Sequence, residues 1–247
     1  MAEPVAEPVI ILVEPQLAEN IGAAARAMLN CGLNTMRLVQ PRPDWPSERA
    51  RNTAAGAEAV LDQATLFRSI AEATGDLQRV YAMTGRNRDL VKLVLTPTQA
   101  VAEMRAATAR GERIGVLFGP ERAGLLNDDV ALVDAVISVP LNPAFHSLNL
   151  AQSVLILAYE WFKADDRTPP LVLQTGDSEV AGKAHLMSFL TRLEAELDDC
   201  GFLRNLEMRP AMVRNIRAMF GRAQLTDQEI RTLHGILTEL VTKRLRD

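Results

Sequence analysis

The sequence predicts an α/β fold: a mostly parallel sheet with helices on both faces, followed by a small all-helical C-terminal extension. Up to about residue 165, short runs rich in β-branched residues alternate with longer segments whose apolar residues recur every three or four positions. Such alternation is typical of parallel sheets, because parallel strands need a crossover connection, usually a helix. After a charged, proline-containing connector no convincing strand follows. We therefore expect an α/β domain over residues 1–165, a linker over 166–177 and a helical domain over 178–247.

The elements of the α/β domain follow from these patterns. The expected strands are Val9–Val13, Met36–Val39, Val80–Met83, Ile114–Phe118 and Ala135–Val139. The expected helices run from Leu17 to near Gly32, over Ala54–Leu66, from Thr96 to about Ala109, and over Ser147–Phe162. The third of these helices opens with a capping box, Thr96-Pro97-Thr98-Gln99, with proline at the first helical position.

Three helices are expected in the C-terminal domain. The first carries Leu186, Phe189, Leu190, Leu193 and Leu197, and the second carries Met208, Met212, Ile216, Met219 and Phe220. The third opens with the capping box Thr226-Asp227-Gln228-Glu229. At about 100° per residue, the apolar residues of the second helix share one face, and Arg214, Arg217 and Arg222 lie opposite. This basic face suits either an RNA phosphate backbone or plain solvation.

Composition and charge narrow the class of protein. The 247 residues are 48% hydrophobic and 23% charged, which is ordinary for a globular chain. No apolar run approaches the roughly 20 residues of a membrane-spanning helix, and the N-terminus lacks the pattern of a signal peptide. The two cysteines provide neither a disulfide framework nor a zinc site. We expect a cytoplasmic protein without a membrane segment or a metal.

The net charge of −4 argues against a protein that coats nucleic acid indiscriminately. The charge is unevenly distributed, because residues 201–247 hold nine basic against five acidic residues. The excess of basic residues therefore lies in the C-terminal part of the chain.

The segment FGPERAGL, residues 118–125, follows a strand and contains two glycines. It is not a phosphate-binding P-loop, because Gly124 is followed by leucines instead of lysine and serine or threonine. No G-x-G-x-x-G follows the first strand either, which disfavours a Rossmann oxidoreductase. Glu121 stands at the carboxyl edge of the strand, where open α/β sheets bind their ligands. The alternative is a solvated loop glutamate.

Other polar residues follow strand ends. The segment ENIGAAARAM holds Asn20 and Arg26, and MTGRNRD holds Thr84, Gly85, Arg86 and Arg88. The segment VPLNPAFHSLNLAQSV concentrates Asn142, His146, Ser147 and Asn149 in one turn. If the strands are neighbours, their loops converge on one pocket for a polar small molecule. An alternative role for Ser147, compatible with a place in the pocket, is to cap the following helix.

Three of these segments, ENIGAAARAM, FGPERAGL and VPLNPAFHSLNLAQSV, resemble in order and spacing the motifs of SpoU/TrmH-type RNA 2′-O-ribose methyltransferases of the SPOUT superfamily. The agreement runs from about Val9 to Trp161. The stretch RNIRAMFGRAQLTDQEIRTLHGIL further resembles the TrmJ subgroup, tRNA methyltransferases that act in the anticodon loop.

The resemblance implies a deep trefoil knot in the C-terminal part of the α/β domain, a homodimer, and S-adenosylmethionine as methyl donor, with no metal. Its implied donor-binding residues are Met83, Thr84, Gly85, Gly119, Val139, His146, Ser147 and Leu148. Its implied catalytic residues are Arg26, Asn20, Glu121, Ser147 and Asn149. Arg26 would accept the ribose proton or act as a fixed cation, and a guanidinium favours the second role because its pKa exceeds about 12.

The implied substrate is RNA, most readily tRNA methylated at nucleotide 32 of the anticodon loop. Contacts to RNA would come from Arg86, Arg88, Arg214, Arg217 and Arg222. Two alternatives are methylation of rRNA and a non-catalytic RNA-binding protein of the same fold. The motifs describe the chemistry of transfer and leave the choice of RNA open.

Overall fold

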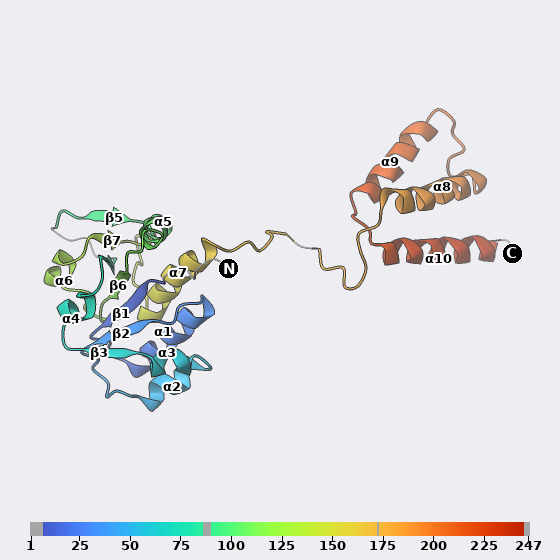
Figure 1. Ribbon diagram of the computed structural model, residues 1–247. Coiled ribbons are helices and arrows are strands. Elements are labelled where there is room, and N and C mark those ends of the chain that lie inside the picture. The colour runs from blue at the N-terminus through green and yellow to red at the C-terminus, as the bar shows by residue number, and fades with distance from the viewer. Residues whose placement is uncertain (1–6, 86–89, 172, 245–247) are drawn as a thin grey trace. The chain divides into compact units, whose positions relative to one another are not determined.

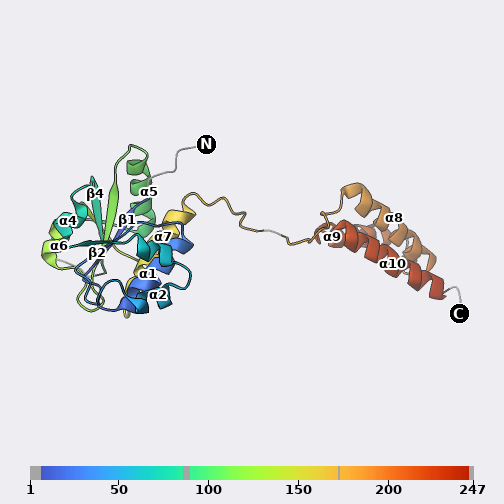
Figure 2. The ribbon, with the colours of Figure 1, turned by 60° about the horizontal axis from the view of Figure 1, so that its bottom comes forward.

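The computed structural model describes residues 7–85, 90–171 and 173–244 (Figure 1). The chain divides into two compact units, Met1–Arg167 and Thr168–Asp247. The first contains the sheet and the second is helical, as a view from a second direction also shows (Figure 2). Each unit is described by itself below.

The described part of the first unit contains a seven-stranded sheet, ordered β3-β2-β1-β6-β4-β7-β5, in which all neighbours are parallel. The strands are β1 Val9–Val13, β2 Met36–Val39, β3 Thr65–Phe67, β4 Arg79–Met83, β5 Leu93–Leu95, β6 Ile114–Phe118 and β7 Ala135–Ile137. The predicted parallel sheet is thus confirmed.

Helices cover both faces of this sheet. They are α1 Ala18–Asn30, α2 Glu48–Ala54, α3 Glu58–Asp62, α4 Ile70–Thr74, α5 Pro97–Thr108, α6 Asn127–Ala131 and α7 Leu150–Lys163. On one face α1, α2, α3, α5 and α7 pack over strand residues such as Ile10 and Leu12. On the other, α4 and α6 pack over Ile11 and Val13. Successive strand residues point to opposite faces, so strands buried on both sides are apolar throughout.

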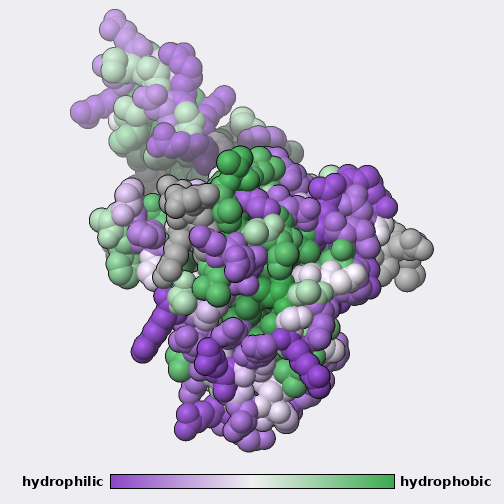
Figure 3. All heavy atoms as spheres, turned by 90° about the vertical axis from the view of Figure 1, so that its left-hand side faces the viewer, coloured by the Kyte–Doolittle hydropathy of each residue, from purple (hydrophilic) through white to green (hydrophobic). Residues whose placement is uncertain are grey.

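The second face of the sheet is covered less completely, because α4 and α6 are short. On this face the edge strand β5 exposes Val94, whose register partner Val136 belongs to the same face, and Leu126 and Leu132 are exposed at the two ends of α6. Figure 3 looks at the side of the unit that carries β5 and α6 in Figure 1, and apolar side chains gather in the middle of this view.

Among the described residues, no helix combines the length and apolar character that crossing a membrane requires.

The predicted helix over Ala54–Leu66 is wrong. Helix α2 ends at Ala54, because Ala55 and Gly56 adopt positive φ values of 47° and 103°. The chain then forms the short α3 and enters strand β3, which pairs with β2. The left-handed turn breaks the helix, and the residues after it complete the edge of the sheet. Strand β5 and helices α4 and α6 were also not predicted.

Two predicted boundaries near the turn between β7 and α7 shift. The strand predicted to reach Val139 ends at Ile137, although the Ser138 N–H still donates to the Leu95 carbonyl at 2.9 Å. The helix predicted to begin at Ser147 begins at Leu150. The intervening turn is therefore longer than predicted, and more of its residues are available to line a site.

The second unit contains α8 Lys183–Asp199, α9 Arg209–Gly221 and α10 Asp227–Arg244. Its core comprises Leu186, Phe189, Leu190, Ile216 and Ile230. The capping box before α10 is confirmed: the Thr226 N–H donates to Glu229 Oε2 at 2.7 Å, and the Glu229 N–H donates to Thr226 Oγ1 at 3.2 Å.

The predicted apolar face of α9 is correct only in part. The helix buries Ile216 together with Val213, and Phe220 packs partly against the core. The three methionines of the predicted face are 37–57% exposed: Met208, Met212 and Met219. At about 100° per residue they form a stripe roughly 100–140° to one side of Val213, so they flank the buried seam.

Candidate functional site

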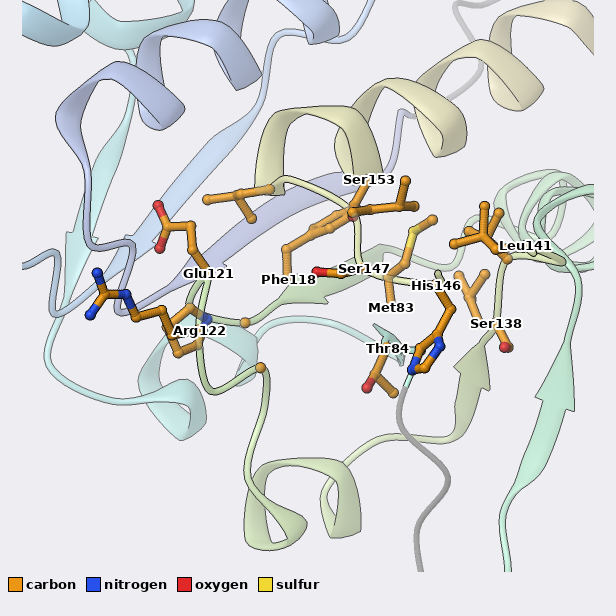
Figure 4. Close-up of a pocket in the computed structure, with 18 of the residues that line it drawn as sticks. Met83, Thr84, Phe118, Glu121, Arg122, Ser138, Leu141, His146, Ser147 and Ser153 are labelled. Atoms are coloured by element: carbon orange, nitrogen blue, oxygen red, sulfur yellow. The ribbon is translucent and has the colours of Figure 1, made fainter. Parts of the chain in front are cut away.

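A cavity of about 580 Å³ lies at the carboxyl ends of β4, β6 and β7 (Figure 4). These three strands are neighbours in the sheet. Their loops meet there with the turn that precedes α7, so the convergence predicted from the sequence is confirmed. Open α/β sheets place ligand sites at this edge.

Most of the predicted site residues line this cavity. They are Met83, Thr84, Gly85, Gly119, Glu121, Val139, His146, Ser147 and Leu148. Asn20, Asn149 and Arg26 do not line it, and Arg86 and Arg88 lie outside the described residues. Among the described residues, no group of three or more His, Cys, Asp or Glu side chains could hold a metal ion.

The carboxylate of Glu121 holds the beginning of α1. It accepts hydrogen bonds from the N–H groups of Gln16 at 2.9 Å and Leu17 at 3.3 Å, and from Asn20 Nδ2 at 2.7 Å. The residue at the N-cap of α1, Leu17, has no side chain that can cap the helix. Glu121 therefore supplies, from a distant part of the chain, the negative charge that a helix N-terminus favours. It is half-buried and not simply a solvated loop glutamate.

Asn20 extends this network to the third motif. Its Oδ1 accepts a hydrogen bond from Asn149 Nδ2 at 2.9 Å. Asn149 in turn caps α7, because its Oδ1 accepts from the Ala151 N–H at 2.8 Å and its N–H donates to Gln152 Oε1 at 2.9 Å. The cap predicted as an alternative role for Ser147 thus belongs to Asn149. Glu121, Asn20 and Asn149 connect all three motifs through two side-chain hydrogen bonds.

Two of the glycines that line the cavity, Gly119 and Gly85, have different reasons to be glycine. A Cβ atom at Gly119 would lie 2.3 Å from the backbone nitrogen of Leu125 and 2.5 Å from the carbonyl carbon of Gly124, which no side chain tolerates. At Gly85 the nearest atom would be the His146 carbonyl oxygen at 3.6 Å, an ordinary contact. Gly119 is required by the folding of its own loop, whereas Gly85 leaves room open toward the cavity.

Arg26 lies apart from the cavity of its own chain. It is exposed on α1, between the buried Ala25 and Ala27. Six residues of an α-helix turn through about 600°, which places Arg26 and Asn20 on different flanks of α1. The structure therefore does not bring together, within one chain, the two residues that the first motif contributes.

The predicted basic face of α9 needs a correction. Arg217 is held by Glu194 of α8 in a two-pronged ion pair, with distances of 2.7 and 2.8 Å. This pairing lowers the pKa of the Glu194 carboxyl, mainly through the hydrogen bond from Arg217. Arg214 and Arg222 are exposed. Arg217 is therefore removed from the predicted basic surface, because its charge is already paired with Glu194.

Several residues at the cavity were not predicted. Arg122, Ser138, Leu141 and Ser153 all line it, and Figure 4 labels each of them. Ser153 donates through its hydroxyl to the Asn149 carbonyl at 3.2 Å. Arg122, Leu141 and Ser153 lie inside the quoted motifs, so their positions were the available signal. Only the sheet order shows that they face one cavity.

Comparison with known families gives two matches that divide the chain. The model of the SpoU rRNA Methylase family matches residues 7–159, which is more than half of the chain. The model of the tRNA methyltransferase TrmJ C-terminal domain matches residues 184–247. The first match covers every motif at the cavity, and the second covers α9, α10 and all of α8 except its first residue.

Curated relatives and a solved structure agree with these matches. The chain is 34% identical to a tRNA (cytidine/uridine/adenosine-2′-O-)-methyltransferase TrmJ of Pseudomonas aeruginosa, over 93% of this chain and 92% of that protein. It is 35% identical to a tRNA (cytidine/uridine-2′-O-)-methyltransferase TrmJ of Pectobacterium atrosepticum, over 94% and 95%. The crystal structure of TrmJ from Z. mobilis ZM4 superposes with a TM-score of 0.83 at 46% identity, covering 95% of this chain and 99% of that one.

Proposed function

The chain belongs to the SpoU methylase family, and we propose from this premise that it transfers a methyl group from S-adenosylmethionine to a ribose 2′-hydroxyl of tRNA. The observation that carries the proposal is the hydrogen-bonded connection of Glu121, Asn20 and Asn149, which ties the three family motifs to one cavity. The C-terminal match and the relatives named as tRNA methyltransferases favour tRNA over rRNA.

The cavity suits a donor of this size and chemistry. Its volume of about 580 Å³ lies within the range of small-molecule sites. Apolar side chains, including Met83 and Ile137, lie beside the polar groups of Thr84 and Ser147. We assign donor binding to Met83, Thr84, Gly85, Gly119, Val139, His146, Ser147 and Leu148. S-adenosylmethionine supplies a methyl group on a sulfonium, which is already activated, so the reaction needs no metal.

The protein's part in the reaction is then to position the ribose and stabilise its oxygen. Holding two reacting groups in alignment contributes several kcal/mol, up to about 7–11 in ideal cases. Glu121, Asn20 and Asn149 fix the start of α1 and the turn before α7, and Ser147 contributes its hydroxyl from that turn. Arg26 stabilises, as a fixed cation, the negative charge that develops on the 2′-oxygen as the hydroxyl proton passes to water and the donor leaves as S-adenosylhomocysteine.

Because Arg26 lies outside its own cavity, a homodimer brings Arg26 of the partner subunit to each site. Supporting this, α1 and α7 carry large apolar side chains that are 38–53% exposed: Leu29, Leu155, Tyr159 and Phe162. Unpaired apolar surface of this kind favours association with a second copy.

The trefoil knot belongs to the same proposal. The turn after β7 returns across the end of β4, where the carbonyl of His146 would lie 3.6 Å from a Cβ at Gly85. Since β4 and β7 are neighbours in the sheet, this contact alone does not require threading, and the support for a chain that threads through its own loop is the match to the SpoU methylase family.

The proposed site of action is nucleotide 32 of the anticodon loop in the cytoplasm, and Arg86, Arg88, Arg214 and Arg222 are the residues proposed to contact the RNA backbone.

The experiment combines calorimetry with product mapping. The full chain is titrated with S-adenosylmethionine and then incubated with tRNA or rRNA transcripts, and 2′-O-methylation is located by mass spectrometry. We expect donor binding and a single modified tRNA nucleotide in the anticodon loop. Modification of rRNA alone would support the rRNA alternative. An absence of donor binding would support a non-catalytic RNA-binding protein.

A further inference from the structure

A second cavity shares a structural wall with the proposed methyl-transfer site. It has a volume of about 520 Å³ and lies between the beginning of α1 and the loop that joins β2 to α2. Gln16 and Leu17 line it, and their N–H groups donate to the carboxylate of Glu121, which lines the first cavity. A single hydrogen-bonded segment therefore separates the two cavities.

This separating segment is fixed from both sides. Opposite Glu121, the guanidinium of Arg42 makes an ion pair with Glu14 at 2.9 Å, and the backbone N–H of Arg42 donates to the Pro15 carbonyl at 3.0 Å. Glu14 and Gln40, which follow the adjacent strands β1 and β2, both have positive φ values, 42° and 45°. Non-glycine residues hold this backbone only where their surroundings enforce it, and such residues cluster at functional sites. The loops that form the cavity are thus built into the fold.

The side chains around the second cavity favour a nucleobase over a phosphate. Carboxylates outnumber guanidinium groups, with Glu19, Asp44 and Glu48 against Arg42 and Arg49. An excess of negative charge repels a phosphodiester. Carboxylates accept hydrogen bonds from the amino groups of bases, arginines donate to ring nitrogens and carbonyls, and an apolar surface contacts the base face. Leu17, which is 54% exposed, supplies such a surface.

We propose that this cavity holds one nucleobase of the bound RNA and thereby selects the nucleotide that is methylated. The base is that of the methylated nucleotide or of its immediate neighbour. The proposal rests on the proposed function, because it requires RNA to be the methyl acceptor. Bases in single-stranded RNA loops are splayed out and are read by their edges in this way.

The test uses the full chain and tRNA transcripts that carry each of the four bases at the methylated position and at each flanking position. Rates are compared for the unaltered protein, for Asp44→Asn, and for Asp44→Asn with Glu48→Gln. The single variant is included because Glu48 stands in the first turn of α2. The matched control, Asp128→Asn with Glu103→Gln, removes two carboxylates that line neither cavity.

We expect both variants of the second cavity to change the ratio of rates between bases at one position by about 5-fold or more. Affinity for S-adenosylmethionine should stay within about 2-fold, and the control should keep the original ratios. A change at the methylated position identifies its own base as the occupant, and a change at a flank identifies the neighbour. Unchanged ratios, or an equal loss of rate for all bases, would overturn the proposal. Failure of the unaltered protein to methylate any tRNA would instead refute the proposed function.

Discussion

Asn20 donates its side-chain amide to Glu121 Oε1 at 2.7 Å, although the two residues are 101 positions apart in the chain. The contact joins the helix after the first strand to the loop after the sixth. Asn20 also accepts a hydrogen bond from Asn149 at 2.9 Å. A substitution at Asn20 therefore affects both the loop that holds Glu121 and the turn before α7.

Glu121→Ala should affect both stability and catalysis. It leaves the first N–H groups of α1 without their acceptor, so we expect the free energy of unfolding to fall by about 1–2 kcal/mol. Methyl transfer should fall by more than 10-fold while donor affinity changes less, because Glu121 positions α1. Urea denaturation, calorimetry and transfer rates measure these effects. Glu103→Ala on α5 is the matched control, and unchanged stability of Glu121→Ala would contradict the capping role.

Arg26 and Gly85 allow a test of whether the site is shared between subunits. Arg26→Ala should abolish transfer, and Gly85→Leu should fill the cavity, because a side chain at Gly85 meets only an ordinary contact at 3.6 Å. If the partner's Arg26 completes each cavity, a hybrid dimer of the two variants contains one intact site. Coexpression should then restore about a quarter of the activity, by random pairing of two inactive chains. No restoration would place Arg26 in its own chain's site.

The ion pair of Asp76 with Arg37 predicts a pH dependence of stability. The hydrogen bond from Arg37 lowers the pKa of Asp76 from 3.8 to about 2. A carboxyl whose folded pKa is lowered stabilises the fold above its unfolded pKa, and loses this effect as the pH falls through the folded value. Asp76 is 41% exposed, so solvent screening leaves roughly 1 kcal/mol. Asp76→Asn should be less stable than the unaltered protein above pH about 4, and the difference should vanish near pH 2.

Urea denaturation between pH 2 and pH 7 measures this difference. Asp128→Asn, an exposed carboxylate of α6, is the control and should show no comparable dependence. A constant difference between Asp76→Asn and the unaltered protein across the whole range would show that the loss has a cause other than the charge.

The exposed arginines of α9 predict a salt-dependent contact with RNA. Replacing Arg214 and Arg222 by glutamine should weaken tRNA binding and reduce its logarithmic salt dependence by about 0.7–0.9 per lost phosphate contact. Arg217 is left intact, because its replacement would unpair Glu194, which is 8% exposed. Binding at three salt concentrations gives the slope. Arg68→Gln with Lys163→Gln, in the first unit, controls for lost charge, and an unchanged slope in the α9 variant would remove RNA contact from that helix.

Local patterns sufficed for the strands that form the site. The apolar runs at β1, β4, β6 and β7 stand out because they are buried on both faces. The turn before α7 stands out because its polar residues interrupt two apolar segments. Those features are encoded within a few residues, so the strand ends and their polar loops could be predicted, whereas the convergence of the loops depended on the strands being neighbours, which the sheet order supplies.

Long-range contacts could not be predicted in this way. The apolar residues of Ala54–Leu66 repeat as in a helix. The helix is prevented only by the left-handed backbone at Ala55 and by the pairing of β3 with β2. The pairing of Arg217 with Glu194 spans 23 positions, and the capping of α1 by Glu121 spans more than 100. Periodicity carries no information about partners at such separations.

Methyl transfer to a chemically altered tRNA distinguishes a ribose acceptor from a base acceptor. The methylated nucleotide, once mapped, is replaced by its 2′-deoxy counterpart in an otherwise identical tRNA, and incorporation of labelled methyl from S-adenosylmethionine is measured with the full chain. We predict stoichiometric incorporation into the ribose substrate and none into the deoxyribose substrate, with similar binding of both RNAs. Incorporation into the deoxyribose substrate would contradict it, because the methyl group would then be carried by a base.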